Sequence, residues 1–248
     1  MKLVLFVLLL TTIVQAGSLR IAAAANLSSV IIPLQKAFSK HHPEIPLRVV
    51  LGGSGKLTAQ IQHHAPFDLF LSADMSYPTY LANHNMTLTQ PQVYTKGSLA
   101  VLILKKKNTH KPLNELLLLP SINHIAMANP KTAPYGKATR QLLQNLHLFT
   151  TLKPKIIYGE SIAQTLNYTL RGSDIGFVAH SALYNKKIAP LLTNFDTIIP
   201  SKDLYKPIKQ GVVILQATNH LKEAQLFYNF LFSDEAQKIF QSYGYTKP

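Results

Sequence analysis

The sequence predicts an α/β fold with mostly parallel sheets and flanking helices. Short apolar runs of strand length recur along the chain, and most are followed by a turn of small residues and a segment with helical apolar spacing. There is no fixed-period repeat, and 248 residues suffice for two modest lobes or one large domain. The predicted strands are 19–22, 47–51, 68–71, 99–104, 125–128, 155–158, 175–178 and 212–215.

The N-terminus has the pattern of a signal peptide over residues 1–16. Lys2 supplies the charged start, residues 3–10 the apolar core, and residues 14–16 a small-residue cleavage site. The apolar core is too short for a good membrane span, so we expect a soluble exported chain that starts near Gly17. The chain has no cysteine, which excludes disulfides and a lipid-modified cysteine and favours a bacterial periplasmic location.

The chain is strongly basic, with a formal net charge of +14. Such a charge admits nucleic acid or an acidic membrane surface as a partner. The lysines are scattered, however, and their one dense run, 105–107, follows an apolar strand and is interpreted as its solvated end. A general positive field also helps to gather a small anion.

Residues 129–136 form the clearest strand–loop–helix unit. The apolar run 125–128 precedes them, and apolar residues with helical spacing follow them. Pro134 suits the first turn of a helix, where a backbone N–H has no intrahelical acceptor. Tyr135 and Gly136 are therefore expected to present free N–H groups at a helix N-terminus, which attracts anions.

Three other loops have the same placement between a strand and a helix, namely 23–26, 52–56 and 159–162. They carry small residues, amides and hydroxyls and few charges; Asn26 is a helix-capping residue type, and Ser54 adds a hydroxyl to a glycine-rich turn. Ligands of α/β folds bind at the carboxyl ends of strands, where helix N-termini point. We therefore expect a site that binds a small anion by hydrogen bonds rather than by a salt bridge.

These loops and their flanking strands resemble the periplasmic molybdate-binding proteins of ABC importers, in the same order and over nearly the whole mature chain. The similar stretches are AAANL (23–27), GSGKL (53–57), APFDLFLSAD (65–74), ANPKTAPYG (128–136), GESIAQ (159–164) and DIGFVA (174–179). The resemblance implies a two-lobed periplasmic-binding-protein fold, type II-like, with a ligand cleft between the lobes. Lobe one is expected to take residues 18–97 and 201–248, and lobe two residues 98–200.

The resemblance also implies a receptor with no enzymatic activity and no cofactor. It is expected to bind molybdate or tungstate in the cleft and to deliver the anion to an ABC permease, which an ATPase on other chains drives. We expect a monomer that does not bind nucleic acid and is not embedded in the membrane.

Four residues are implied as ligands of the oxyanion, which they would hold through its oxygens. Asn26 takes the place where a serine or a threonine–asparagine pair usually binds an oxygen, and Ser54 would donate its hydroxyl and amide. Tyr135 and Ile162 would donate backbone N–H groups, so their side chains matter less. Two positions depart from the family pattern: Asn26 replaces the common serine, and Ala179 replaces a tyrosine whose hydroxyl completes the site in some members.

The loops favour a fully deprotonated oxyanion over phosphate. Phosphate near neutral pH carries a proton and benefits from a carboxylate acceptor, whereas molybdate, tungstate and sulfate need donors only. Loops 23–26, 52–56 and 129–136 contain no Asp or Glu. Glu160 is the exception, and we assign it to helix capping, because carboxylates favour first turns. Sulfate differs from molybdate mainly in size, so a receptor for sulfate or another tetrahedral oxyanion is the nearest alternative.

Two other classes of protein are less well supported. An enzyme would be favoured by a nucleophile elbow, a metal-ligand cluster or a phosphate-loop signature, and the sequence has none of these. An exported basic adhesin or nucleic-acid-binding protein would explain the charge, and tight DNA binding with a steep salt dependence would support it.

Overall fold

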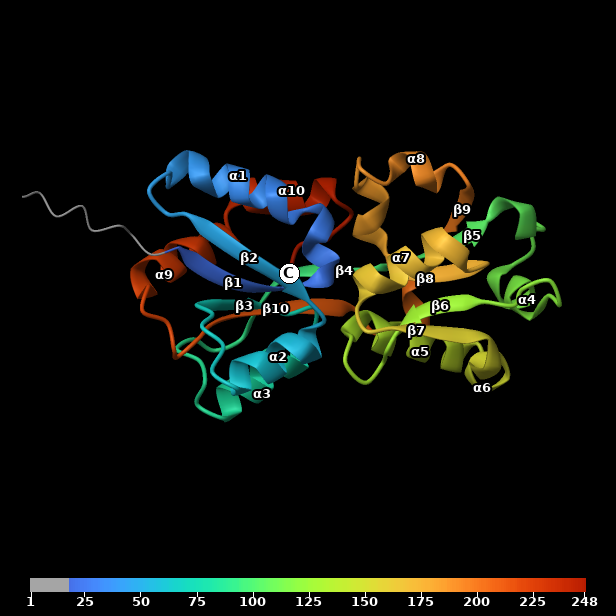
Figure 1. The fold of residues 1–248 in the computed structure, drawn as a ribbon, viewed down its shortest axis with the longest axis horizontal. Helices are drawn as coiled ribbons and strands as arrows, with labels where there is room; N and C mark the ends of the chain where they lie inside the picture. Colours follow the sequence, from blue (N-terminus) through green and yellow to red (C-terminus); the bar gives the residue numbers. More distant parts are fainter. Residues whose placement is uncertain (1–17) are drawn as a thin grey trace, which may run out of the picture.

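The computed structural model describes residues 18–248, which form two α/β lobes side by side (Figure 1). The predicted signal peptide, 1–16, lies outside the described residues. Within residues 18–248, no helix has both the length and the apolar character needed to cross a membrane. The two-lobed α/β fold is confirmed, with one five-stranded sheet in each lobe.

Lobe one contains a mixed sheet in the strand order β2-β1-β3-β10-β4. Its central strand β1 pairs in parallel with β2 and β3, whereas β10 is antiparallel to β3 and β4. The strands are β1 (Leu19–Ala24), β2 (Leu47–Gly52), β3 (Leu69–Leu71), β4 (Gln92–Gly97) and β10 (Ile208–Ile214).

Helices cover both faces of this sheet because its central strands are apolar on both sides. Ile21 packs on one face with α1, α9 and α10, and Ala22 packs on the other with α2 and α3. The first set is α1 (Ile31–His41), α9 (Leu221–Phe230) and α10 (Asp234–Ser242), and the second is α2 (Ser54–Gln62) and α3 (Ser76–Asn83). A 3-10 helix, η1 (Ala25–Ser29), precedes α1. The late start of α1 fits Pro33, which is tolerated in the first turn but not further along.

Lobe two repeats the plan with the strand order β7-β6-β8-β5-β9. Strand β6 is parallel to β7 and β8, and β5 is antiparallel to β8 and β9. The strands are β5 (Leu99–Leu104), β6 (Ile125–Ala128), β7 (Ile156–Gly159), β8 (Ile175–Ala179) and β9 (Phe195–Ile198).

The lobe-two sheet also lies between two helical layers. One face packs on α4 (Leu113–Leu118), α5 (Pro134–Asn145) and α6 (Phe149–Leu152), and the other on α7 (Ile162–Gly172), η4 (His180–Tyr184) and α8 (Ala189–Leu192). Three more 3-10 turns are η2 (Lys105–Lys107), η3 (Lys153–Lys155) and η5 (Lys202–Leu204). The lysine run 105–107 therefore directly follows β5, as the sequence predicts.

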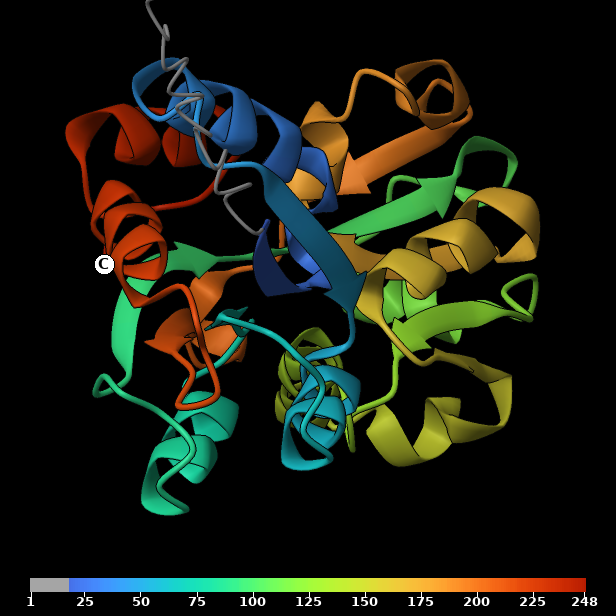
Figure 2. The same ribbon diagram turned by 60° about the vertical axis from the view of Figure 1, so that its left-hand side comes forward.

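The chain crosses between the lobes twice. It passes from β4 into β5 through Ser98, and it returns from β9 to β10 through residues 199–207 (Figure 2). The C-terminal segment returns to the crossing, where Thr246 pairs with Lys96 of β4. The prediction of mostly parallel sheets needs adjustment here, because β5 and β10, which follow the crossings, run antiparallel to both of their neighbours.

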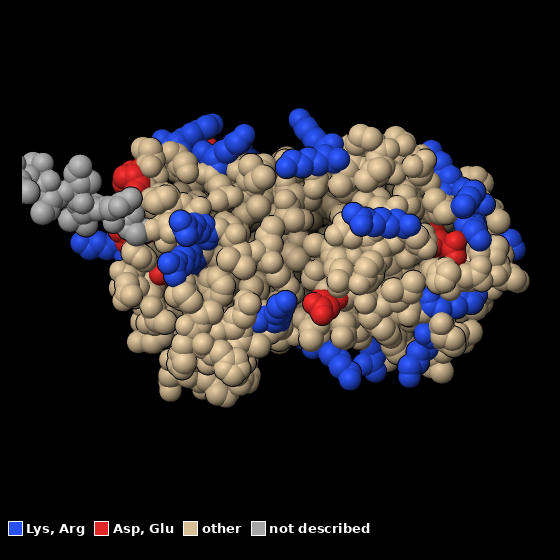
Figure 3. Space-filling model, in the orientation of Figure 1, with Lys and Arg blue, Asp and Glu red and all other residues tan. Residues whose placement is uncertain are grey.

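One face of the molecule carries its positive charge in a dispersed form (Figure 3). On the face shown in Figure 3, Lys and Arg side chains are spread over both lobes and do not gather into one dense patch. The region between the lobes is mostly uncharged on that face. A dispersed charge gives a general field without a defined nucleic-acid footprint.

Candidate functional site

A small cavity lies between the two lobes, and none of its lining residues is charged. Its free volume is about 10 Å³, far below the roughly 300–1,000 Å³ typical of pockets for drug-sized ligands. The cavity therefore suits one small ligand. Its lining comprises Ala24, Ala25, Asn26, Gly52, Gly53, Ser54, Ala73, Ala133, Pro134, Tyr135 and Ile162.

Three helix N-termini converge on this cavity. Ser54 is the first residue of α2, Tyr135 the second of α5, and Ile162 the first of α7. The first N–H groups of a helix have no intrahelical acceptor, and the helix dipole makes that end partly positive. The cavity thus receives N–H donors and partial positive charge from both lobes, which is the arrangement that binds anions.

The sequence positions α5 as predicted. Pro134 occupies the first turn of the helix, preceded by the extended residue Ala133. Gly136 lets the helix start against β6, because a Cβ there would lie 2.7 Å from the Ala128 carbonyl carbon. The N–H of Tyr135 is therefore held at the end of β6, at the cavity.

Ser54 contributes a hydroxyl that is already oriented. The residue is 1% exposed, and its Oγ accepts a hydrogen bond of 3.0 Å from the Ala73 N–H. The backbone N–H thus occupies a lone pair of Oγ and leaves the hydroxyl hydrogen free to donate. The hydroxyl can then donate to an oxygen in the cavity.

The lobes are in contact around the cavity. Gly55 N–H of lobe one donates to Thr132 C=O of lobe two over 3.0 Å. Lys137 Nζ of α5 lies 3.0 Å from Asp74 Oδ2 of lobe one. A Cβ on Gly55 would lie 2.9 Å from the same Thr132 oxygen, so glycine permits this approach.

Asn26 is buried at the cavity wall but does not cap a helix. It lies inside η1, whose N-cap position is Ala24, so the capping interpretation of this residue is wrong. Its Nδ2 donates to Gln210 Oε1 at 2.9 Å and to the Tyr245 hydroxyl at 3.0 Å. These bonds fix η1 to β10 and to the C-terminal segment, because a buried amide must find partners within the protein.

Tyr245 and Ser181 link the two lobes beneath the cavity. The Tyr245 hydroxyl donates to the Asn26 carbonyl over 2.9 Å, and the Ser181 hydroxyl of lobe two donates to the same carbonyl over 3.1 Å. Burial raises the pKa of Tyr245 to about 12, although hydrogen bonds with Ser181, Asn26 and Gln210 oppose the rise. The hydroxyl therefore stays protonated across the physiological pH range and remains a donor.

The Tyr135 side chain has a larger role than its backbone N–H suggests. The residue is 1% exposed, and its hydroxyl lies close to Gly97 in the crossing between the lobes. Burial raises its pKa well above the usual value, the neighbouring hydroxyls of Tyr245 and Tyr94 raise it further, and Gln210 opposes the rise. The hydroxyl is thus enclosed between the lobes, and the expectation that the side chain matters less than the backbone N–H for the ligand stays a prediction.

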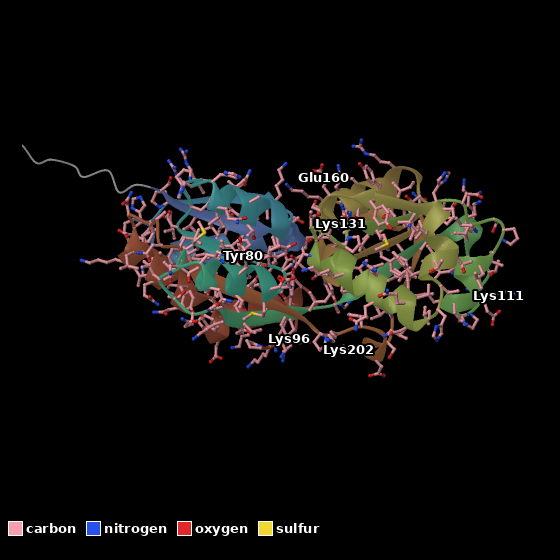
Figure 4. All side chains as sticks on the ribbon, turned by 90° about the horizontal axis from the view of Figure 1, so that it is seen from below. Tyr80, Lys96, Lys111, Lys131, Glu160 and Lys202 are labelled. Carbon is pink, nitrogen blue, oxygen red and sulfur yellow. The ribbon has the colours of Figure 1, made fainter. Side chains whose placement is uncertain are left out.

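The start of α7 is capped by Ser161 rather than by Glu160. Ser161 Oγ accepts from Gln164 N–H at 3.2 Å, and Gln164 Oε1 accepts from Glu160 N–H at 2.6 Å, which differs from a capping box only in that the second donor precedes the N-cap residue. The Glu160 side chain takes no part, so its assignment to capping is wrong. Glu160, labelled in Figure 4, is exposed and lies at the opening between the lobes, and it does not line the inner cavity.

Ala179 lies at the end of β8 and is 3% exposed. It packs in the apolar cluster that also contains Ala25 and Tyr135, and it does not line the cavity. The position where some family members have a tyrosine therefore supplies no polar group in this chain.

Sequence reasoning missed the residues that hold Asn26 in place. Gln210 and Tyr245 are 184 and 219 positions away from it along the chain. Neither belongs to a local motif, and Gln210 follows the exposed Lys209 in a strand whose other residues are apolar or glycine. A polar residue in a strand that is buried along most of its length was the one signal that pointed to a partner.

Comparisons with known proteins show which family and fold this chain is similar to. A family model described as bacterial extracellular solute-binding protein matches residues 19–246. The molybdate-binding protein ModA of Azotobacter vinelandii is 34% identical over 241 residues, covering 96% of this chain and 93% of that protein. ModA of Rhodobacter capsulatus is 31% identical over 233 residues, covering 93% of this chain and 89% of that protein. The solved structure of the Azotobacter vinelandii periplasmic molybdate-binding protein matches with a TM-score of 0.81 at 28% identity, covering 93% of this chain and all of the other.

Proposed function

This chain belongs to the bacterial extracellular solute-binding proteins, and from that premise we propose that it is a receptor for molybdate or tungstate. The anion binds in the interlobe cavity through Asn26, Ser54, Tyr135 and Ile162, and the receptor delivers it to an ABC permease. The relatives named for molybdate support this ligand, since they match over almost the whole chain.

The observation that carries the proposal is the convergence of three helix N-termini on an uncharged cavity. Such a site offers N–H and O–H donors and no carboxylate acceptor. A fully deprotonated oxyanion needs donors on every oxygen, whereas hydrogen phosphate also needs an acceptor for its proton. The site therefore favours molybdate and tungstate over phosphate.

The proposed receptor performs no chemistry of its own. It closes its lobes on the ligand, as hinge-type binding proteins do, and the closed form is what the permease recognises. The signal pattern over residues 1–16 supports export to the periplasm. Release of a mature chain starting near Gly17 by osmotic shock checks the location, and a chain retained in the cytoplasm would contradict it.

The function is tested by thermal unfolding of the mature protein with molybdate, tungstate, sulfate and phosphate in turn, at one ionic strength. A ligand at about 100 times its dissociation constant stabilises the protein by roughly 2.7 kcal/mol, which raises the midpoint clearly. We expect a rise with molybdate and tungstate, and calorimetry then ranks the two. An equal rise with sulfate would mean a less selective oxyanion receptor, and no rise with any anion would refute the proposal.

A further inference from the structure

Three buried polar atoms without a hydrogen-bond partner lie in one cluster beneath the cavity. Within residues 18–248, four buried side-chain atoms lack a partner, and three of them are Asn26 Oδ1, Gln210 Nε2 and the Tyr135 hydroxyl. A buried polar atom without a hydrogen-bond partner destabilises the protein, so three such atoms together indicate a site that lacks hydrogen-bond partners.

Gln210 stands at the centre of this cluster. Its Oε1 accepts from Asn26 Nδ2 at 2.9 Å and from the Tyr94 hydroxyl at 3.0 Å. Its Nε2 faces the Tyr135 hydroxyl: a Cβ on Gly97 would collide with that hydroxyl and would lie 2.8 Å from Nε2. The approach of Gln210 lowers the pKa of Tyr135 against the larger effect of burial, yet no hydrogen bond of good geometry joins the pair.

A half-turn of both side-chain amides pairs Gln210 with the Tyr135 hydroxyl and leaves Asn26 Nδ2 as the unpaired amide atom. Such a turn exchanges the oxygen and nitrogen of an amide, which have nearly the same shape. The Tyr94 hydroxyl then accepts from Gln210 and the Tyr245 hydroxyl then donates to Asn26 Oδ1, which reverses both bonds, while Ser181 still donates to the Asn26 carbonyl. Gln210 Nε2 then donates to Asn26 Oδ1, and Gln210 Oε1 then faces the Tyr135 hydroxyl as an acceptor for its hydrogen. Asn26 Nδ2 then occupies the one amide position for which the protein provides no partner.

The geometry points to Gln210 and the Tyr135 hydroxyl as positioning residues that turn the Asn26 amide so that its Nδ2 donates to the bound oxyanion. This inference rests on the proposed function, because the ligand supplies the missing acceptor. Asn26 lines the cavity and is 2% exposed, so an oxygen of the anion is the acceptor within its reach. The order of donation runs from Tyr135 to Gln210 to Asn26 to the ligand.

The direction of this relay also sets the selectivity of the site. With Nδ2 toward the cavity, Asn26 favours an oxyanion without a proton. With Oδ1 toward the cavity, it would repel that anion and would accept the proton of hydrogen phosphate. The Tyr135 hydroxyl, kept protonated by its raised pKa, is the donor that selects the first orientation.

The test compares Tyr135→Phe with the wild type and with Tyr205→Phe. Tyr135→Phe keeps the backbone N–H in the cavity and removes only the hydroxyl that begins the relay. Tyr205 is the control: it is 5% exposed and close enough to Tyr135 to raise the pKa of that residue, but its hydroxyl accepts from Leu99 N–H and makes no hydrogen bond to Gln210 or Asn26. Molybdate affinity is measured by calorimetry, phosphate is the competitor, and the unfolding midpoint is measured without ligand.

We expect Tyr135→Phe to weaken molybdate binding by about 3- to 10-fold, to narrow the preference for molybdate over phosphate, and to lower the ligand-free midpoint. Tyr205→Phe lowers the midpoint but leaves the affinity unchanged. Unchanged affinity together with an unchanged or raised midpoint in Tyr135→Phe would overturn the inference, because an unpaired hydroxyl can be removed without loss. Binding by the wild type separates this failure from a failure of the proposed function, in which the wild type itself binds no oxyanion. The ligand-free midpoint still reports whether the Tyr135 hydroxyl is paired in that case.

A double-mutant cycle with Gln210→Met gives a second readout. If Tyr135 acts through Gln210, the double variant loses about as much affinity as Gln210→Met alone. Losses that simply add would mean that the two residues act independently and would contradict the relay.

Discussion

The two lobes build their halves of the proposed site from different chemistry. Lobe one presents two side chains, the Asn26 amide and the Ser54 hydroxyl, besides the N-terminus of α2, whereas lobe two presents only backbone N–H groups at the starts of α5 and α7. A side-chain donor is lost by substitution, but a backbone donor survives any substitution that leaves the helix start in place. Lobe one should therefore be sensitive to residue identity, and lobe two to backbone geometry.

The largest effect is expected at Ser54, on the side-chain half. Ser54→Ala removes one hydrogen bond to a charged ligand, which is worth about 1.5–3 kcal/mol, or roughly 10- to 150-fold in affinity. The free energy of unfolding should change little. The Ala73 N–H that donates to Ser54 Oγ lies at the cavity, where a water molecule can replace the hydroxyl. Calorimetric titration with molybdate measures the loss.

Ser161→Ala is the matched change on lobe two. Ser161 caps α7 by accepting from Gln164 N–H and does not line the inner cavity. Its loss should lower the free energy of unfolding by about 1 kcal/mol and change the affinity by less than about threefold. If both serine variants lost affinity equally, the contrast between the two halves would not hold.

The second-largest loss of affinity is expected at Gly55, where the two lobes approach each other closely. In Gly55→Ala the new Cβ would lie 2.9 Å from the Thr132 carbonyl oxygen and 2.8 Å from the Tyr77 hydroxyl. The Tyr77 hydroxyl belongs to lobe one and is the mobile end of a side chain, whereas the clash with the Thr132 backbone exists only when the lobes are closed. Overpacking of this kind costs about 1–3 kcal/mol, so affinity should fall by roughly 5- to 150-fold. Small-angle scattering with molybdate should show a less compact protein than the wild type.

Gly172→Ala is the control for that change, because no atom lies within 4 Å of a Cβ placed there. It removes a glycine from the end of α7 and should raise stability by about 0.4–1 kcal/mol without altering affinity. Normal closure and affinity in Gly55→Ala would show that the lobes need not meet at this point.

The contrast between the halves also explains what could be predicted from the sequence. The strand–loop–helix order and the proline at the start of α5 are local signals, so the fold and the N-terminus at Tyr135 were predictable. The orientation of Asn26 was not, because it depends on Gln210 and Tyr245, which reach it only through the return of the chain across the hinge. Glu160 was misassigned because a local capping preference fits two adjacent residues equally well, and Ser161 holds the N-cap position.

A smaller effect is expected at His180, where lobe two meets the C-terminal segment of lobe one. Burial lowers the pKa of His180 below 6.5 and nearby Lys202 lowers it further, while a hydrogen bond with the Gly244 backbone opposes the shift. Because the folded pKa is depressed, the unfolded chain binds more protons between the two values. Stability contributed by neutral His180 is therefore present above pH 6.5 and is lost as pH falls through the folded pKa.

Denaturant unfolding of the wild type and of His180→Gln between pH 5 and 8 measures this contribution. The wild type should lose more stability than the variant on going from pH 7 to pH 5, and the other histidines cancel in the difference. Because His180 is partly exposed, the difference should be modest. If the free energies of unfolding of the two proteins changed in parallel with pH, His180 would have the same pKa in the folded and unfolded states, and the prediction would be wrong.

The smallest effect on affinity is expected at Ile162, on the backbone half. Ile162→Val should cost about 0.5–1.5 kcal/mol of stability, because the side chain is 6% exposed in the lobe-two core, and should change molybdate affinity by less than about twofold.

Ile162→Pro is the informative counterpart. Proline is well tolerated as the first residue of a helix, and Ser161 already has the extended backbone that precedes a proline. The proline variant thus removes the N–H while α7 can still form, so a loss of affinity in proline and not in valine would assign the contribution to the backbone. Equal affinities in the two variants would instead mean that α7 acts only through its dipole.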